Sequence, residues 1–470
     1  MGFEFAEIDA IINAGSMAIV GASQKPMKFG TSFTAAQLTF GFSGAVYLVN
    51  PSEEEIMGRD VYPDLLSLPE TPDLVYLMIP AHLSMDVLRQ CAQMGVKGVV
   101  IMAAGFRDIG EEGKALEKLA LQLAREAGFR IIGPNCFGLY NPRNRLTLLP
   151  GFDFSTEPGK TAFISQSGGY AAHIGSQAQS LGIRFSAIVS YGNAADLNES
   201  DLLLYFGQDP QTDVIAGYLE GATDGRRFFE VLREVSSQKP VVLWKVGKTE
   251  QSRRAVASHT GSLAGDAKVW EGLFRQCGVI QAEGVEEILD VLMVLQHLGR
   301  NPGNKLILAG GGGGLGTHAA DLAEKQGLQV PPLETETLSR LQKILTRAGA
   351  VAGNPLDIGA PLIPLPIFEA VMQEAAANPS TDILLLDLAM NFAYRLHGEE
   401  GMSQAMDSLA RITHQTGKPA VVVLYSRAAR SEDIHLEEIL RRLRSQLLQN
   451  GIPVFPSINR ALRAISLVNR

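Results

Sequence analysis

The 470-residue sequence predicts an α/β protein made of parallel sheets. Short apolar runs of strand length alternate with longer stretches of helical periodicity along the chain. Many of the 48 glycines stand where a predicted strand meets a predicted helix. The pattern recurs three times, which agrees with the two or three domains expected for this length. We therefore expect successive domains at residues 1–142, 151–300 and 303–470.

Composition and charge narrow the functional classes. Hydrophobic residues make up 46% of the chain, enough for sizeable cores, and the net charge of −9 argues against a broad nucleic-acid-binding surface. Cys91, Cys136 and Cys277 show no paired spacing, so we expect no disulfide framework and a reducing compartment. The N-terminus lacks a signal-peptide pattern and no apolar run reaches membrane-spanning length, so a soluble cytoplasmic protein is expected.

In the first domain the predicted strands lie at residues 16–20, 45–50, 74–79, 98–102 and 130–132. The carboxyl ends of parallel strands meet at one edge, so the turns after them should line one crevice. The turn at Gly21 lacks the glycine spacing of a dinucleotide fingerprint. Lys25 and Lys28, just before a predicted helix, suit a phosphorylated ligand, although an ordinary solvated loop is the alternative.

The turn Gly133-Pro134-Asn135-Cys136 follows the last strand of this domain. A rigid proline, an amide and a thiol at a strand end indicate contact with a reacting group. A free cysteine is more commonly a small buried hydrophobe, so we do not predict Cys136 to be a nucleophile.

The second domain has predicted strands at residues 161–164, 185–189, 214–219 and 241–244. The turn Ser165-Gln166-Ser167-Gly168-Gly169 leads into a predicted helix at 171–180. Such a turn directs free N–H groups and the positive end of the helix dipole at one point, which suits a phosphate or a phosphohistidine. A plain tight turn is the alternative.

His259 lies in a run of small residues at 255–265. Since no cysteine or histidine nearby has metal-ligand spacing, no metal site is expected. An accessible imidazole can attack phosphorus and carry the phosphoryl group covalently, although an isolated histidine is more often a capping or core residue. Glu220, after the strand at 214–219, could bind one ring nitrogen and leave the other free, and simple solvation is its alternative.

The third domain begins with a predicted strand at 305–308 and five glycines at 310–314, followed by a predicted helix at 317–326. Further strands are predicted at 383–386 and 420–424, with helices at 366–376 and 436–450. Consecutive glycines indicate close approach of the backbone to a ligand or another segment, and a flexible linker is the alternative.

Taken together, these motifs resemble the α subunit of NDP-forming acyl-CoA synthetases of the ADP-forming acetyl-CoA synthetase type, in the succinyl-CoA synthetase superfamily. The resemblance covers essentially the whole chain. It is most specific at residues 258–265 and 245–247, and it extends to 133–136, 165–169 and 192–196. It implies a Rossmann-like CoA-binding domain, then two flavodoxin-like parallel-sheet ligase domains and a phosphohistidine.

The resemblance also implies roles for individual residues. His259 would carry the phosphoryl group and Glu220 would orient its ring. The residues implied around the phosphohistidine are Ser167, Gly168, Gly169 and Gly261. The residues implied for CoA are Gly21, Ser23, Lys25, Lys28, Asn50, Pro80, Ala81 and Asn135.

The implied chemistry is reversible and links a thioester to a nucleotide. An acyl-CoA and phosphate give an acyl phosphate and CoA, the phosphoryl group moves to His259, the loop swings, and ADP becomes ATP. No nucleotide-grasp module follows the third domain, so we expect ADP or ATP with Mg on a separate β subunit, for example in an α2β2 heteromer. A small acyl substrate is expected, and no nucleic acid or membrane partner.

Two other function classes compete with this prediction. A CoA- or acyl-CoA-binding sensor would keep the fold without turnover, but it would need neither His259 nor Glu220. A nicotinamide dehydrogenase ranks last, because the turn at Gly21 lacks the expected glycine spacing. The third domain also departs from the family in one respect, since Ala309 stands before the glycine run where a polar asparagine is usual.

Overall fold

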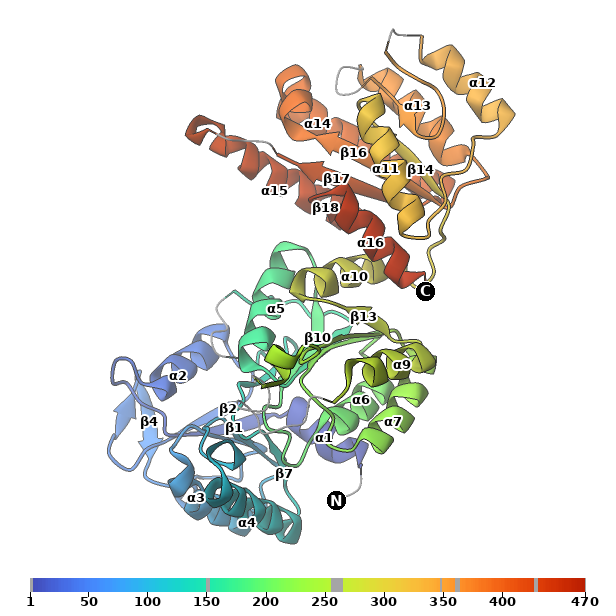
Figure 1. Ribbon diagram of the computed structural model, residues 1–470. Coiled ribbons are helices and arrows are strands. Elements are labelled where there is room, and N and C mark those ends of the chain that lie inside the picture. The colour runs from blue at the N-terminus through green and yellow to red at the C-terminus, as the bar shows by residue number, and fades with distance from the viewer. Residues whose placement is uncertain are drawn as a thin grey trace. The chain divides into compact units, whose positions relative to one another are not determined.

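The computed structural model describes residues 3–148, 153–254, 265–346, 349–359, 364–426 and 430–469. The chain divides into two compact units, residues 1–288 and 289–470. The first unit contains a seven-stranded and a six-stranded sheet, and the second contains a five-stranded sheet (Figure 1). These mostly parallel sheets, connected by helices, confirm the predicted α/β class.

The first sheet has the strand order β3-β4-β2-β1-β5-β6-β7, and it is parallel except for the short β3–β4 hairpin. Its strands are β1 (Ser16–Val20), β2 (Ala45–Val49), β3 (Glu55–Ile56), β4 (Arg59–Tyr62), β5 (Leu74–Leu77), β6 (Gly98–Ile101) and β7 (Arg130–Ile132). Its helices are α1 (Phe5–Ile12), α2 (Phe29–Phe40), α3 (Ala81–Met94) and α4 (Glu111–Ala127), with short 3-10 turns at Leu65–Ser67 and Arg107–Ile109. The five strands predicted here are present, and the hairpin is an addition.

Alternate residues of these strands belong to two different cores. Ile19 and Tyr76 pack with side chains of α1 and α2, whereas Val75 and Val99 pack with side chains of α3 and α4. Strands buried on both faces read as continuous apolar runs, which is why the sequence pattern located them well.

The second sheet has the order β13-β12-β11-β9-β10-β8. Its strands are β8 (Gly138–Tyr140), β9 (Thr161–Ser165), β10 (Phe185–Ser190), β11 (Val214–Leu219), β12 (Val241–Lys245) and β13 (Ile280–Ala282). Its helices are α5 (Gly168–Ser180), α6 (Glu199–Gln208), α7 (Gly225–Gln238) and α9 (Ala267–Cys277). The edge strand β8 is antiparallel to β10, so residues 138–140 enter this sheet directly after the first sheet ends. The two sheets of the first unit are therefore joined by the short turn at residues 133–137.

In the second unit the sheet order is β15-β14-β16-β17-β18, and all pairings are parallel. Its strands are β14 (Leu306–Gly310), β15 (Leu356–Asp357), β16 (Ile383–Ala389), β17 (Ala420–Tyr425) and β18 (Val454–Phe455). Its helices are α11 (Gly313–Lys325), α12 (Thr335–Ile344), α13 (Leu365–Ala377), α14 (Met390–Thr416), α15 (Ile434–Gln449) and α16 (Ile458–Val468), with a 3-10 turn at Ser431–Asp433. The helix α10 (Val285–Leu298) spans the boundary between the units.

The glycine run of the second unit is part of a strand–turn–helix connection. Gly310 ends β14, and α11 begins at Gly313, four residues before the predicted start of the helix. Glycine has a poor helix propensity, so sequence reasoning placed these residues outside the helix. The hydrogen bond from Gly312 N to Asp357 Oδ1, 3.1 Å long, fixes the turn that allows the early start. None of the described helices is both long and apolar enough to cross a bilayer.

Candidate functional site

The turn after β1 is built around close backbone contacts. Gly21 has φ +90°, and a Cβ there would lie 2.8 Å from the Met78 carbonyl oxygen. A Cβ on Gly30, in the first turn of α2, would lie 2.1 Å from the Gly21 carbonyl oxygen. The amide of Asn50 donates to the Ala22 carbonyl at 2.7 Å. The contact at Gly30 thus places the amino end of α2 directly over the turn, and Gly21 and the Asn50 amide fix the turn itself.

The polar side chains of this turn differ in whether they are free to bind a ligand. Ser23 is buried, and its hydroxyl contacts Glu53 Oε1 at 3.0 Å while accepting the Lys25 backbone N–H at 3.1 Å. Lys25 and Lys28 are exposed. Within the ranges that the structure describes, neither lysine side chain has an ion pair. The lysines can therefore reach an anionic ligand, whereas the Ser23 hydroxyl is already engaged by the protein.

Phe137 connects three of the predicted segments. Two residues before it, Asn135 has φ +58° in the turn between the two sheets. Its ring centroid lies 6.0 Å from that of Phe29, the first residue of α2. A Cβ on Gly168, the first residue of α5, would lie 2.8 Å from the same ring. The amino ends of α2 and α5 and the turn at Asn135 consequently lie around one aromatic side chain.

The turn into α5 has the geometry expected of an anion site. Ser167 is the N-cap residue, and its hydroxyl accepts the Tyr170 N–H at 3.3 Å. A Cβ on Gly169 would meet little, since the nearest atom is the Ser167 hydroxyl oxygen at 3.9 Å. Free N–H groups at a helix start favour anions through hydrogen bonds and the helix dipole. The first turn of a 13-residue helix is therefore open to an anion beside Gly169.

Glu220 lies beside this turn, at the carboxyl end of β11. Its side chain is 5% exposed. The Gln166 side-chain oxygen accepts the Glu220 and Gly221 backbone N–H groups, which fixes the end of β11 against the end of β9. The Tyr218 hydroxyl donates to Glu220 Oε1 at 3.3 Å, whereas Oε2 has no hydrogen-bond partner among the described residues. A buried carboxylate oxygen without a partner is costly, so this atom is suited to receive a donor that arrives during function.

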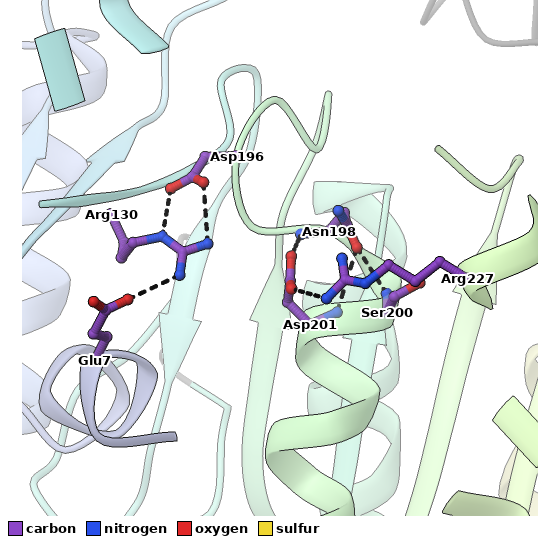
Figure 2. Close-up of polar contacts among 7 residues, drawn as sticks. All are labelled: Glu7, Arg130, Asp196, Asn198, Ser200, Asp201 and Arg227. Atoms are coloured by element: carbon purple, nitrogen blue, oxygen red, sulfur yellow. Dashed lines mark hydrogen bonds and ion pairs between the residues drawn. The ribbon is translucent and has the colours of Figure 1, made fainter. Parts of the chain in front are cut away.

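Besides the connecting turn at residues 133–137, the two sheets of the first unit meet at residues 191–198. A Cβ on Gly192 would lie 2.2 Å from the Asn135 carbonyl oxygen, and Asn193 N donates to the Pro134 carbonyl at 2.9 Å. Nearby, Arg130 binds both oxygens of Asp196 and, through its third nitrogen, Glu7 (Figure 2). The turn that carries Asn135 is thus fixed to the second sheet from two directions.

Comparisons with known proteins agree with this architecture. Residues 15–142 match the model of a CoA binding domain, and residues 158–295 match that of the succinyl-CoA ligase like flavodoxin domain. Over 465 residues the chain is 34% identical to the alpha subunit of the ADP-forming acetate–CoA ligase I of Pyrococcus furiosus, covering 98% of this chain and 96% of that one. The chain belongs to the family of ADP-forming acyl-CoA ligases.

Two further relatives support the assignment to this ligase family. The ligase chain is 36% identical over 455 residues to the ADP-forming acetate–CoA ligase I of Archaeoglobus fulgidus, and it spans 62% of that protein's length. A dinucleotide-forming acetyl-coenzyme A synthetase 1 of Ca. Korarchaeum cryptofilum, solved in complex with phosphate and ADP, has a TM-score of 0.84 at 31% identity. That comparison covers 98% of the ligase chain and 96% of the solved chain.

The site residues predicted for the ligase fall into three groups. Those at strand ends of the first sheet are Gly21, Ser23, Asn50, Pro80, Ala81 and Asn135, with Lys25 and Lys28 in the first turn. Ser167, Gly168, Gly169 and Glu220 lie together at the carboxyl edge of the second sheet. His259 and Gly261 lie outside the described residues.

Sequence reasoning missed the roles of Phe137 and Gln166, which connect the predicted segments. For Phe137, the signal available in the sequence was a large aromatic residue directly after the Asn135-Cys136 turn. Cys136 is 3% exposed, and burial raises the pKa of its thiol to about 12, which agrees with a structural rather than a nucleophilic residue. Within the described ranges, no group of three or more acidic, cysteine or histidine side chains has the arrangement of a metal site.

The close contact at Gly30 gives a first testable prediction. We expect Gly30→Ala to lower the free energy of unfolding by about 1–3 kcal/mol, because its Cβ would overlap the Gly21 carbonyl. Gly272, inside α9, is the matched control, because a Cβ there would meet no atom within 4 Å. Gly272→Ala should stabilise the chain by up to about 1 kcal/mol. Chemical denaturation of both variants measures the difference, and equal stabilities would contradict the packing described here.

Proposed function

We propose that this chain is the α subunit of an NDP-forming acyl-CoA synthetase, interconverting acyl-CoA, ADP and phosphate with acid, CoA and ATP. The observation that carries the proposal is the position of Phe137. Its ring contacts the start of α2, beside the lysine turn, and the start of α5, beside Glu220. A thioester bound along the first sheet would therefore end close to an anion held at the second.

Coenzyme A is a phosphorylated and largely extended ligand, and the residues at the edge of the first sheet fit it. Lys25 and Lys28 are exposed and placed to bind its phosphates near the amino end of α2. Gly21 and Asn50 would shape the turn that meets the ligand, through the close contact of Gly21 with the Met78 carbonyl and the bond of the Asn50 amide to the Ala22 carbonyl. Pro80 and Ala81 follow β5 and Asn135 follows β7, the strands on either side of β6 at the same edge, and we propose that the pantetheine arm lies there. Ser23 would shape the turn through Glu53 rather than bind phosphate through its hydroxyl.

The phosphoryl group would be handled at the second sheet. The N–H groups at Gly168 and Gly169 and the hydroxyl of Ser167 would stabilise phosphate or the phosphohistidine at His259, together with Gly261. The free Oε2 of Glu220 would accept one ring N–H of His259, fixing the tautomer that leaves the other nitrogen nucleophilic.

The proposed reaction balances in three reversible steps. Phosphate attacks the thioester carbonyl, the C–S bond breaks, and CoA leaves with an acyl phosphate remaining. The free nitrogen of His259 attacks phosphorus, the bond from phosphorus to the acyl oxygen breaks, and the carboxylate leaves. Glu220 holds the proton on the other nitrogen. ADP then accepts the phosphoryl group from the histidine to give ATP.

We infer that the nucleotide and its Mg are bound by a separate β subunit. The support is that the Pyrococcus furiosus relative, which this chain matches over almost its full length, is named as an alpha subunit. An α2β2 heteromer and a cytoplasmic location are part of the same proposal.

The test is transfer of labelled phosphate to the purified chain. With acetyl-CoA and [³²P]phosphate, we expect one base-stable, acid-labile phosphoryl group per chain, and a series of other acyl-CoA thioesters would define the acyl preference. The His259→Ala variant gives the background level of labelling, because it lacks the proposed phosphoryl carrier. A chain that binds CoA but takes up no label from any thioester would instead be the binding protein of the alternative proposal.

A further inference from the structure

Three aromatic side chains pack together at the carboxyl edge of the second sheet. Tyr170 lies in the first turn of α5, Tyr218 lies near the end of β11, and Trp244 lies near the end of β12. The ring centroid of Tyr170 is 4.8 Å from that of Tyr218 and 4.8 Å from that of Trp244, and the last two are 5.0 Å apart. Tyr218 is 6% exposed, so its ring is held in a buried position by contacts with both neighbours. The proposed function gives this tyrosine no role.

The hydroxyl of Tyr218 is the hydrogen-bond donor found for the Glu220 side chain within the described residues. It donates to Oε1 at 3.3 Å, and Oε2 has no partner there. Gln166 contacts Glu220 through the backbone N–H and not through the carboxylate. The terminal torsion of a glutamate has broad preferences, so a hydrogen bond to one oxygen is needed to fix where the other oxygen points. The Tyr218 hydroxyl supplies that bond.

The Tyr218 hydroxyl is suited to remain a donor. Burial is the largest cause that raises the pKa of Tyr218 above its ordinary value, and the charge of Glu220 raises it further. The hydroxyl therefore stays protonated at neutral pH, and an ionised carboxylate can only accept. The contact with Oε1 thus has one direction, from tyrosine to carboxylate, and it leaves Oε2 as the open acceptor.

We propose that Tyr218 is a positioning residue whose hydroxyl holds Oε1 of Glu220, so that Oε2 is directed at the ring N–H of the phosphoryl-carrying histidine. The inference rests on the proposed function, because Glu220 is the residue through which Tyr218 acts. The ring of Tyr170 extends the arrangement to the anion turn, since the Tyr170 backbone N–H donates to the Ser167 hydroxyl at 3.3 Å. One aromatic contact thereby links the carboxylate that would orient the histidine to the helix start that would hold the phosphate.

The first experiment measures ³²P uptake from acetyl-CoA and [³²P]phosphate by rapid quench. Tyr218→Phe keeps the ring and removes only the hydroxyl. We expect the rate constant for uptake to fall about 10- to 100-fold, the worth of one hydrogen bond to a charged group. The concentrations of acetyl-CoA and phosphate that give half the maximal rate should stay within about twofold of wild type, because the hydroxyl is assigned to neither ligand. An unchanged rate constant, or a loss that appears only as weaker binding, would overturn the proposal.

Tyr205 provides the matched control, because its hydroxyl also donates to a carboxylate. It is 1% exposed in α6, its hydroxyl lies 2.9 Å from Asp9 Oδ1, and its ring stacks on that of Phe5 with centroids 4.9 Å apart. Tyr205→Phe removes an equivalent bond within the same unit. It should lower the free energy of unfolding while leaving the rate constant for uptake within about twofold of wild type. An equal fall of the rate constant in both phenylalanine variants would show that the effect is structural and would overturn the proposal.

A second experiment tests whether Tyr218 acts through Glu220. The rate constants for uptake by wild type, Tyr218→Phe, Glu220→Gln and the double variant form a cycle. Tyr218→Phe should change the rate constant by less than about threefold in the Glu220→Gln background, since no carboxylate remains to be directed. Losses that multiply independently would overturn the proposal.

The same four proteins separate this inference from the proposed function. If wild type takes up label and Tyr218→Phe is equally fast, the inference fails and the proposed function stands. If wild type takes up no label, the proposed function fails, and the free energies of unfolding of the same cycle decide whether Tyr218 holds Glu220. Coupling of the two substitutions in stability would show that it does, and additive effects would overturn the contact as well.

Discussion

Glu220→Gln should slow phosphoryl transfer to the chain by about 10²- to 10⁴-fold, the range seen when an orienting carboxylate or general base is lost. An amide can present its NH₂ instead of an oxygen to the imidazole, which favours the wrong tautomer. The buried Oε2, free of donors in the described part of the chain, is the atom whose replacement matters. Rapid-quench measurement of ³²P uptake from acetyl-CoA and phosphate gives the rate.

Glu199 is the matched control for this substitution. It is fully buried in the same domain, at the start of α6, and its Oε1 accepts the Thr223 backbone N–H at 2.7 Å. Burial raises its pKa, so a neutral amide is a close substitute. Glu199→Gln should therefore retain uptake within about tenfold of wild type. If Glu199→Gln is as slow as Glu220→Gln, then burial of a carboxyl group, rather than its position, explains the loss.

Much of the candidate site could be predicted because its residues are local in sequence. Strand, turn and helix follow one another at Gly21 and at Ser167, so a linear pattern contains the whole turn. No local sequence pattern marks Phe137. Its role depends on contacts of its ring with the starts of α2 and α5, two helices that are distant in sequence.

The fold shows the same division between local and long-range information. Buried parallel strands such as Gly98–Ile101 are apolar throughout and were located correctly. The edge strand Gly138–Tyr140 is too short to give a period, and its membership of the second sheet depends on pairing with β10. The early start of α11 within the glycines also depends on a tertiary contact, the bond from Gly312 to Asp357. In each case the missing information is a contact between segments far apart in the chain.

Arg130→Met should lower the free energy of unfolding by about 3–5 kcal/mol, the cost of leaving the buried carboxylate of Asp196 without its cation. The Arg130 side chain is 2% exposed and binds Asp196 at 2.9 and 3.1 Å and Glu7 at 3.0 Å. These partners come from the loop after β10 and from α1, so the loss acts on the contact between the two sheets of the first unit. Chemical denaturation, followed by fluorescence, measures the change.

The ion pair of Arg227 with Asp201, also drawn in Figure 2, is the comparison that isolates burial of the guanidinium. Asp201 is 5% exposed and Asp196 is 9% exposed, but Arg227 is 35% exposed whereas Arg130 is 2% exposed, so water already reaches the arginine of the Asp201 pair and the expected cost of Arg227→Met is smaller than that of Arg130→Met. A second variant separates charge from packing at the buried pair. Adding Asp196→Asn to Arg130→Met removes the unpaired charge while the new side chain can still accept the Ile131 N–H. It should therefore recover part of the lost stability. If the double variant is less stable than Arg130→Met alone, the destabilisation comes from lost packing of the arginine stem and not from an uncompensated carboxylate.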